Sequence, residues 1–435
     1  MKAIVIGAGL AGCEAAYYLA NHGVDVELWE MKPEKYSPAH VHGGFAELVC
    51  SNSLKSNELA TASGMLKAEM RLLGSVVLSC ADETSVPAGG ALAVDRVAFS
   101  NAVTERIKAC PNITVVCKEA TEIPSEGAVI IATGPLTSDA MAEHIEKLMG
   151  GEGLHFFDAA SPIVTEESID PEKSFRLARY GKGGDDYINC PLTKEEYENF
   201  HRELVAAEGA QLHEFDKSCK VFESCMPVEI AAKRGADTLR FGIMKPVGLT
   251  DPSTGRRPYA VLQLRQDNAE GTLYNLVGFQ TNLKFGEQKR VFSMIPALAN
   301  AEFVRYGVMH RNTYLDSPKK LSCDFSLKED PRVFFAGQMT GVEGYIESAM
   351  SGLVAGIACL KRLKGEKLPP FPRETGIGAL TAYISTENVD FQPMNINFGI
   401  LPDLGENIRD KKEKRRRLAE RSVNSLKDFI SENDI

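Results

Sequence analysis

The 435-residue sequence lacks the features of a membrane-spanning or disulfide-built protein. No stretch approaches the ~18 uninterrupted apolar residues of a membrane helix, and the N-terminus carries no cleavage-site pattern. Ten Cys are too sparse for a disulfide framework, and neither C-x-x-C nor H-E-x-x-H occurs, so the sequence indicates no metal site. We therefore expect a soluble, cytoplasmic protein whose Cys residues act singly.

An excess of basic residues is also missing. The sequence has 49 Lys and Arg against 59 Asp and Glu, a formal charge of -10. This balance argues against a protein that coats nucleic acid or an anionic membrane through its net charge, although a local basic surface is compatible with it. Hydrophobic residues at 44% and charged residues at 25% are typical of a globular chain and exclude disorder. The length predicts two or three domains.

The N-terminus predicts a strand, a Gly-rich turn and a helix. A β-branched and apolar run over residues 2–6 is followed by an Ala-rich helical stretch over 13–21, and between them lies the turn Gly7-Ala8-Gly9-Leu10-Ala11-Gly12. Gly7 permits the tight turn, Gly9 lets a pyrophosphate approach the helix N-terminus, and Gly12 lets the helix pack on the strand. The pattern favours dinucleotide binding over the alternative of a merely structural turn.

Three further segments support this interpretation and suggest which dinucleotide is bound. A second strand, 24–29, ends at Glu30, close to the offset at which an acid binds the adenosine ribose hydroxyls. Buried-strand patterns at 128–134 and 333–338 end at Gly134 and at Gly337-Gln338, and the second precedes a Gly/Ala-rich helix. Each pattern alone is compatible with any buried α/β strand, but together they favour FAD over NAD. No second strand-linked G-x-G-x-x-G exists for NAD(P)H, so we expect a nicotinamide reductant to visit the flavin transiently.

The sequence between these nucleotide-binding segments predicts an insertion. It contains a helix over 193–209 that starts with a Thr193/Glu196 capping box, and strands over 259–265 and 274–279. We therefore predict an α/β fold in which a Rossmann-type FAD domain is split by a mixed α/β insertion domain. The predicted domains are 1–160 (FAD domain, first part), 161–321 (insertion) and 322–435 (FAD domain, second part, with a C-terminal helix).

Basic residues cluster in the insertion and in the tail. Those of the insertion are Lys233, Arg234, Arg240, Lys245, Arg256, Arg257, Arg265, Lys284, Lys289, Arg290, Arg305 and Arg311, interleaved with Phe279, Phe285, Phe292 and Tyr306. They predict either a surface that neutralises phosphates and stacks bases or a solvated face above core aromatics. Residues 410–421 predict a charged exposed helix, with an RNA-contacting tail as the alternative.

Two Cys residues have polar neighbours. Cys50 lies in ELVCSNSLKS at 47–56, after His40 and His42, and Cys225 lies in FESCMPVE at 222–229. Small polar and basic surroundings favour a reactive thiol, whereas most Cys residues are small buried hydrophobes. Apolar or helical surroundings predict inert thiols at five further positions, namely Cys13, Cys80, Cys110, Cys117 and Cys359.

Several long strings resemble the folate- and FAD-dependent tRNA (uracil-54-C5)-methyltransferase family, TrmFO. Besides 47–56 they are VPAGGALAVDR at 86–96, FESCMPV at 222–228, MKPVGL at 244–249, GFQT at 278–281, RYGVMHRNT at 305–313 and FQPMN at 391–395. The resemblance covers essentially the whole chain. The strings distinguish it from the related GidA/MnmG flavoproteins, which modify the tRNA wobble uridine.

The resemblance implies transfer of the methylene of methylenetetrahydrofolate to carbon 5 of the T-loop uridine, with FAD and NAD(P)H supplying the electrons. Carbon 5 of uracil is a poor nucleophile, so a thiolate must first add to carbon 6. We predict Cys225 as this nucleophile and Cys50 as the partner that takes the carbon-5 proton or handles the methylene. The expected partners are tRNA, folate and NAD(P)H, with no protein partner. The alternatives are a general FAD-dependent NAD(P)H oxidoreductase and a non-catalytic tRNA-binding flavoprotein.

Overall fold

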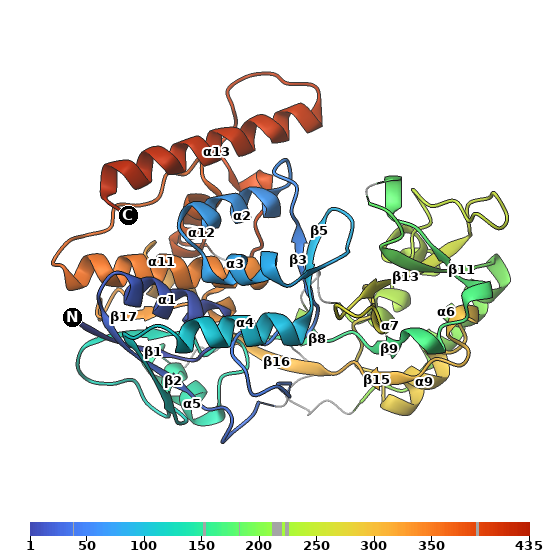
Figure 1. The fold of residues 1–435 in the computed structure, drawn as a ribbon, viewed down its shortest axis with the longest axis horizontal. Coiled ribbons are helices and arrows are strands. Elements are labelled where there is room, and N and C mark those ends of the chain that lie inside the picture. The colour runs from blue at the N-terminus through green and yellow to red at the C-terminus, as the bar shows by residue number, and fades with distance from the viewer. Residues whose placement is uncertain (38, 151–153, 182, 211–219, 222–225, 389–390) are drawn as a thin grey trace.

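The structure is a computed structural model that describes all residues except 38, 151–153, 182, 211–219, 222–225 and 389–390. A parallel sheet and an antiparallel sheet lie side by side, one in each of two lobes of the molecule (Figure 1). Among the described residues, no helix combines the length and apolar character needed to cross a bilayer.

The sheet of the larger lobe is parallel, in the order β17-β7-β1-β2-β6. Its strands are β1 (Lys2–Ile6), β2 (Asp25–Glu30), β6 (Ile113–Cys117), β7 (Ala128–Ile131) and β17 (Val333–Phe335). Strand β17 pairs with β7 although the whole second sheet lies between them in the sequence. The four strands predicted for this sheet are therefore confirmed, and they meet in one Rossmann-type sheet.

Helices cover both faces of the parallel sheet. Val5, Ile130 and Phe334 lie in one core with helices α1 (Leu10–Asn21) and α11 (Tyr345–Leu363). Their neighbours Ile6, Ile131 and Phe335 point the other way and pack with α5 (Asp139–Leu148). Side chains alternate between faces along a strand, so both sides of the sheet are buried.

Further helices and a small sheet extend the larger lobe. They are α2 (Ala62–Leu72), α3 (Val76–Glu83), α4 (Arg96–Lys108), α12 (Gly376–Ser385) and α13 (Lys411–Asn433), with strands β3 (Ser53–Ser56), β4 (Ser85–Val86) and β5 (Ala91–Val94). The fully buried carboxylate of Glu69 in α2 joins three of these helices. It accepts the backbone N–H groups of Gly376 (2.7 Å) and Ile377 (2.9 Å) at the start of α12 and the hydroxyl of Ser422 in α13.

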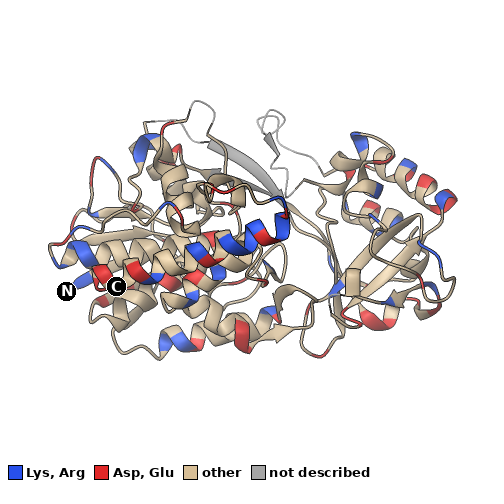
Figure 2. Ribbon diagram, turned by 90° about the horizontal axis from the view of Figure 1, so that it is seen from above, with Lys and Arg blue, Asp and Glu red and all other residues tan. Residues whose placement is uncertain are grey.

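The basic segment after residue 410 is helical, as predicted. Three of its cations are paired on the helix itself or with the preceding loop: Arg416 with Glu413 and Glu420, Lys414 with Asp403, and Arg417 with Glu406. Figure 2 shows blue and red alternating along α13. This charge pairing favours the charged exposed helix over the RNA-contacting tail.

The sheet of the smaller lobe is antiparallel, with six strands in the order β10-β11-β13-β14-β9-β15. The strands are β9 (Ile163–Thr165), β10 (Phe175–Arg176), β11 (Tyr187–Leu192), β13 (Ala260–Gln266), β14 (Leu273–Leu276) and β15 (Phe303–Arg305). Its helices are α6 (Lys194–Ala206), α7 (Val228–Lys233), α8 (Thr238–Phe241) and α9 (Phe285–Phe292). The predicted capping box at Thr193 and Glu196 is present. Helix α6 ends three residues before the predicted position.

A third sheet lies between the lobes and consists of β8 (Leu154–Ala159), β12 (Lys220–Val221) and β16 (Met309–Tyr314). Its strands come from both sides of the boundary that we propose at residue 160. The fold class agrees with the prediction: a Rossmann-type α/β unit interrupted by a mixed α/β insertion. The division into 1–160, 161–321 and 322–435 stays our proposal for the domains.

Candidate active site

The Gly-rich turn connects β1 to α1 with almost no room for side chains. Gly7 has a φ of +98°, and its N–H donates to the carbonyl of Trp29 at 2.7 Å. A Cβ on Gly12 would overlap the carbonyl oxygen of Gly7, whereas a Cβ on Gly9 would meet no atom within 4 Å. Gly7 and Gly12 therefore allow the turn and the packing of α1, while Gly9 opens onto free space.

Glu30 holds this turn from the end of β2. One carboxylate oxygen accepts the N–H of Ala8 at 2.8 Å, and the other accepts the N–H of Lys32 at 2.9 Å. The residue is buried. A carboxylate retains further lone pairs beyond these two bonds, so a role in binding ribose hydroxyls stays a prediction.

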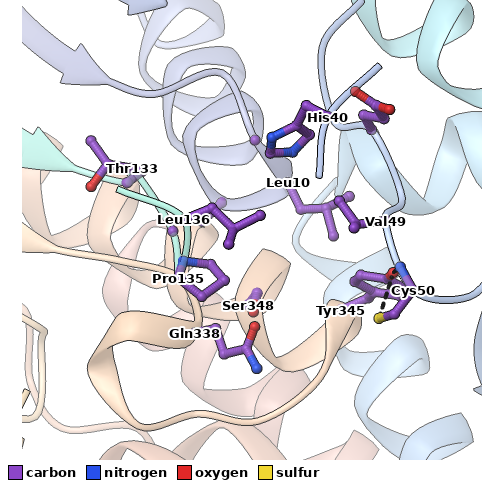
Figure 3. A pocket seen from close by; sticks show the side chains of 16 residues that line it. Leu10, His40, Val49, Cys50, Thr133, Pro135, Leu136, Gln338, Tyr345 and Ser348 are labelled. Carbon is purple, nitrogen blue, oxygen red and sulfur yellow. Dashed lines mark hydrogen bonds between the residues drawn. The ribbon is translucent and has the colours of Figure 1, made fainter. Parts of the chain in front are cut away.

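A pocket of about 810 Å³, including the space open to solvent at its mouth, lies beside the Gly-rich turn (Figure 3). Four separate chain segments line it: Gly9, Leu10 and Ala11; His40, Glu47, Val49 and Cys50; Ala132, Thr133, Gly134, Pro135 and Leu136; and Gly337, Gln338, Tyr345 and Ser348. Seven of the predicted site residues line the pocket: Gly9, Leu10, Ala11, Gly134, Gly337, Gln338 and Cys50. The other predicted cofactor residues shape the turn without lining the pocket; they are Gly7, Ala8, Gly12 and Glu30.

The segment that follows β17 forms a further wall of the pocket, next to the Gly-rich turn. The N–H of Gly337 donates to the hydroxyl of Ser351 at 2.7 Å, and the side-chain amide of Gln338 donates to Glu343 at 2.7 Å. Helix α11 then begins at Tyr345, whose side chain lines the pocket. The first-turn N–H groups of a helix attract negative charge, so this end of α11 suits a polar or anionic part of a ligand.

Cys50 contacts Tyr345 at the pocket edge. The Tyr345 hydroxyl lies 2.9 Å from the N–H of Cys50, 3.2 Å from the N–H of Ser51 and 3.0 Å from Sγ of Cys50. Two N–H donors occupy the two lone pairs of the oxygen, so its proton is directed at the sulfur. Burial, followed by the nearby Cys50, raises the pKa of Tyr345 well above its usual range. Tyr345 is therefore protonated at neutral pH, and its hydrogen bond to Sγ favours the thiolate form of Cys50.

Two arginines fix the backbone around Cys50. Arg96 of α4 donates to the carbonyls of Leu48 (2.9 Å) and Val49 (3.1 Å) and pairs with Asp267 at 3.0 Å. Arg265 of β13, which belongs to the other lobe, donates to the side chains of Asn52 (2.8 Å) and Ser51 (2.7 Å).

Arg265 is buried, and burial lowers the pKa of its guanidinium, which nonetheless stays charged at neutral pH. Asn52 is also fully buried, and its amide donates to the carbonyls of Val94 (2.9 Å) and Gln266 (2.8 Å). Both lobes therefore contribute to the position of Cys50.

Lysines support the strand that follows Cys50. Lys55 pairs with the buried Glu347 of α11 at 2.8 Å. Lys67 is buried beneath this strand and donates to the carbonyls of Leu54 and Ser56, both at 2.7 Å. Burial lowers the pKa of Lys67 to about 7. These contacts join the Cys50 segment to the helix that carries Tyr345.

A second polar group lies at the His40 side of the pocket. One oxygen of Glu47 accepts the N–H groups of Val41 (2.9 Å) and His42 (3.2 Å), and the other lies 3.6 Å from Nζ of Lys32. His40 is hydrogen-bonded to Ser37 at 2.6 Å. Burial, followed by the nearby Lys32 cation, lowers the pKa of His40, so a neutral imidazole faces the pocket at neutral pH.

The second predicted catalytic residue, Cys225, lies outside the described residues. Among the Cys residues predicted to be inert, burial raises the pKa of Cys13, Cys80 and Cys359, as expected for thiols in apolar surroundings. Cys117 is exposed at the end of β6, contrary to the expected apolar setting, because that strand is at the edge of the sheet.

Sequence reasoning did not assign Tyr345, Glu47 or Thr133 to the pocket. Thr133 belongs to the predicted strand and turn at 128–134, and Tyr345 begins the Gly/Ala-rich helix that follows 333–338. Both positions carried a usable signal, because ligands commonly bind where parallel strands end and helices begin.

Comparison with known proteins identifies the family of the chain. The family described as glucose inhibited division protein A matches residues 2–367. A protein of Acetivibrio thermocellus named methylenetetrahydrofolate–tRNA-(uracil-5-)-methyltransferase TrmFO is 60% identical over 428 residues, 98% of each chain. A protein of the same name from Enterococcus faecalis is 57% identical over 97% of each chain. The chain belongs to the TrmFO family.

The structural comparison places this TrmFO chain in the same fold as GidA. A solved structure of Aquifex aeolicus GidA superposes with a TM-score of 0.70 at 16% identity, covering 99% of this chain and 75% of that one. At this identity the similarity shows the fold alone. The TrmFO relative of Acetivibrio thermocellus, in contrast, matches over nearly its full length.

Proposed function

We propose that the protein is a tRNA methyltransferase that forms 5-methyluridine at position 54 of the T-loop, with methylenetetrahydrofolate as carbon donor and FAD and NAD(P)H as the reducing system. The observation that carries the proposal is Cys50, held against the Tyr345 hydroxyl at the edge of the pocket beside the Gly-rich turn. The 55–60% identical relatives bear the name of this activity. We also propose that the protein acts in the cytoplasm.

The pocket residues fit FAD. The open space over Gly9 is where a pyrophosphate would lie against the start of α1, and Gly134, Gly337 and Gln338 line the continuing wall. Leu10, Val49, Pro135 and Leu136 offer the apolar surface that an aromatic ring system requires. When bound, FAD supplies the electrons that reduce the transferred methylene to a methyl group.

The protein's own residues supply the covalent chemistry in this proposal. The thiolate of Cys225 adds to carbon 6 of the uracil, which raises the electron density at carbon 5 so that it can attack the methylene carbon. Cys50 then takes the proton from carbon 5 as the bond between the methylene carbon and the folate nitrogen breaks and tetrahydrofolate leaves. The hydride that converts the resulting exocyclic methylene into a methyl group would come from reduced FAD, and Cys225 leaves carbon 6 as a thiolate. The hydrogen bond from Tyr345 supports this role because a base must be deprotonated before it acts.

Alanine variants of the two Cys residues should differ in whether they form a covalent adduct with tRNA. Cys50→Ala and Cys225→Ala should both abolish methylation of unmodified tRNA while retaining FAD, because neither residue lies in the Gly-rich turn. With tRNA carrying 5-fluorouridine, whose fluorine cannot leave as a proton, Cys50→Ala should still form a covalent adduct and Cys225→Ala should not. The reverse result would exchange the two roles, and trapping by both variants would identify a different nucleophile.

The carbon donor provides an independent test. Unmodified tRNA, NADPH and the protein should give 5-methyluridine with methylenetetrahydrofolate and none with S-adenosylmethionine. NADPH oxidation without tRNA methylation would instead support a small-molecule oxidoreductase, which the names of the relatives do not favour.

A further inference from the structure

The smaller lobe carries a patch of exposed apolar side chains that the proposed chemistry does not use. We name it the aromatic patch; it consists of Tyr180, Phe241, Ile243 and Val247. Phe241 is 72% exposed and Tyr180 is 61% exposed. Three of the four residues lie in or beside MKPVGL, one of the strings that resemble the family. Grouped exposed apolar residues indicate a binding surface, whereas single ones need no explanation.

Contacts with Gly248 hold Tyr180 beside the segment that carries the other three residues of the patch. Tyr180 has a φ of +59°, unusual for a residue with a side chain, and its N–H donates to the carbonyl of Gly248 at 3.1 Å. Its ring lies on the backbone of Gly248, where a Cβ would stand 2.7 to 2.9 Å from three ring carbons. A backbone strain of this kind is retained where the surroundings impose it, and it points to function.

Phe241 is fixed through a neighbouring cation. The guanidinium of Arg240 lies over the Phe241 ring at 4.6 Å and over the Tyr259 ring at 4.5 Å, and Asp237 pairs with it at 2.9 Å. Met244, in the same turn, accepts the N–H of Val261 in β13 at 3.0 Å. The turn that presents Phe241 is therefore tied to the sheet.

The surroundings of the aromatic patch are positively charged. Residues 233–257 contain six Lys or Arg and two Asp, a formal charge of +4, although the whole chain carries -10. Lys233, Lys245, Arg256 and Arg257 are exposed, and within the part of the chain that the structure describes none of them forms an ion pair. Exposed aromatic rings beside unpaired cations suit a partner with planar bases and phosphates.

A row of polar side chains connects the patch to the Cys50 segment. Arg265, which holds Ser51 and Asn52, is two residues from Gln263 on β13, about 7 Å along the strand. Gln263 accepts a hydrogen bond from Arg179 at 2.5 Å, and Arg179 donates to the carbonyl of Val247 at 2.8 Å. A row of hydrogen bonds along one face of β13 thus links the patch to the Cys50 segment.

We propose that the aromatic patch binds unpaired bases of the RNA substrate by stacking, with Lys245, Arg256 and Arg257 on the adjoining phosphates. The inference rests on the proposed function, since it takes tRNA as the substrate. A second protein would not explain the unpaired cations, which suit a polyanion. Loss of one base–aromatic stack weakens binding by about 5- to 100-fold.

The test measures binding of unmodified tRNA to the FAD-loaded protein at several salt concentrations. Phe241→Ala should weaken binding by at least about 5-fold without changing the slope of log K against log salt, because no charge is lost. Phe241→Trp should retain the affinity. Lys245→Gln should lower the slope by up to about 0.9. Flavin absorbance and flavin reduction by NADPH should stay unchanged in all three.

Phe285→Ala is the matched control, because Phe285 is 55% exposed in the same lobe but its ring is stacked on Tyr306 at 4.9 Å, and two neighbouring cations are paired, Lys284 with Glu208 and Arg290 with Glu287. It should bind tRNA as the wild type does. Wild-type affinity of Phe241→Ala, or an equal loss with Phe285→Ala, would overturn the assignment. If the wild type methylates tRNA while Phe241→Ala binds normally, only this inference fails; if the wild type neither binds nor methylates tRNA, the proposed function fails too.

Discussion

Replacing Tyr345 with Phe tests the contact at the centre of the site while keeping the ring volume. The change deletes one hydroxyl, which accepts the N–H groups of Cys50 and Ser51 and donates to the Cys50 sulfur. A buried donor without an acceptor costs about 1–3 kcal/mol. Cys50 and Ser51 are only partly buried, so water replaces part of the lost bonding, and we expect the free energy of unfolding to fall by about 1–2 kcal/mol.

The ionisation of the Cys50 thiol in Tyr345→Phe is a more specific measure of this contact than the change in stability. A hydrogen bond to an ionised acceptor is worth about 1.5–3 kcal/mol and one to a neutral acceptor about 1 kcal/mol, so the hydroxyl favours the thiolate over the thiol by roughly 1 kcal/mol. Its loss should lower the thiolate fraction of Cys50 at neutral pH about fivefold. The alkylation rate of the Cys50 peptide with iodoacetamide, followed by mass spectrometry from pH 6 to 9, should fall by a similar factor.

Tyr197→Phe is the control for this experiment. The Tyr197 hydroxyl also makes a hydrogen bond, to the carbonyl of Ala236 at 2.7 Å, but in the core of the smaller lobe. It should cost about 1 kcal/mol of stability and leave Cys50 alkylation unchanged. An alkylation profile of Tyr345→Phe identical to that of the wild type would refute the assignment of the hydroxyl proton to the sulfur.

The sequence predicted the parallel sheet because its signals are local. A strand, a Gly-rich turn and a helix are encoded within the first 30 residues, and the buried runs that end at Gly134 and Gly337 have the length and composition of central strands. Side-by-side pairing of these strands follows from the Rossmann topology once each is recognised.

Two predicted element ends were wrong, that of the helix over 193–209 and that of the strand over 274–279, because contacts with other parts of the chain determine where these elements end. Helix α6 stops at Ala206 because the next residues pair with another segment: the N–H of Lys284 donates to Glu208 and that of Ala210 to Asn282. Strand β14 ends before the predicted Phe279 because Gly278, with a φ of +79°, turns the chain. Such contacts have no periodic signature in the sequence.

The environment of Cys50 could not be predicted for the same reason. Its partner Tyr345 is 295 positions away, and the Arg265–Asn52 bond spans 213 positions. Polar neighbours in the sequence marked Cys50 as a candidate, but the groups that act on it come from α11 and from the other lobe.

Three further sets of substitutions test FAD binding, the pH dependence of folding stability and the positioning of Cys50. Gly9→Val should give folded, colourless protein because the side chain fills the space over the turn, whereas Gly12→Ala should unfold it by collision with the turn; flavin absorbance and circular dichroism distinguish these outcomes. Burial raises the pKa of Glu69 from 4.5 to about 7, so the folded protein keeps a proton that the unfolded chain releases between these values. The free energy of unfolding should therefore fall as pH rises from 4.5 to about 7, and Glu69→Gln should remove this part of the pH dependence in urea titrations at pH 5 and 7. Arg265→Lys keeps a cation but cannot donate to Asn52 and Ser51 through a planar fork. Because a small displacement of a reacting group is costly, we expect the single-turnover methylation rate to fall at least about tenfold while FAD content and tRNA affinity are retained. A wild-type rate in Arg265→Lys would mean that the larger lobe alone positions Cys50.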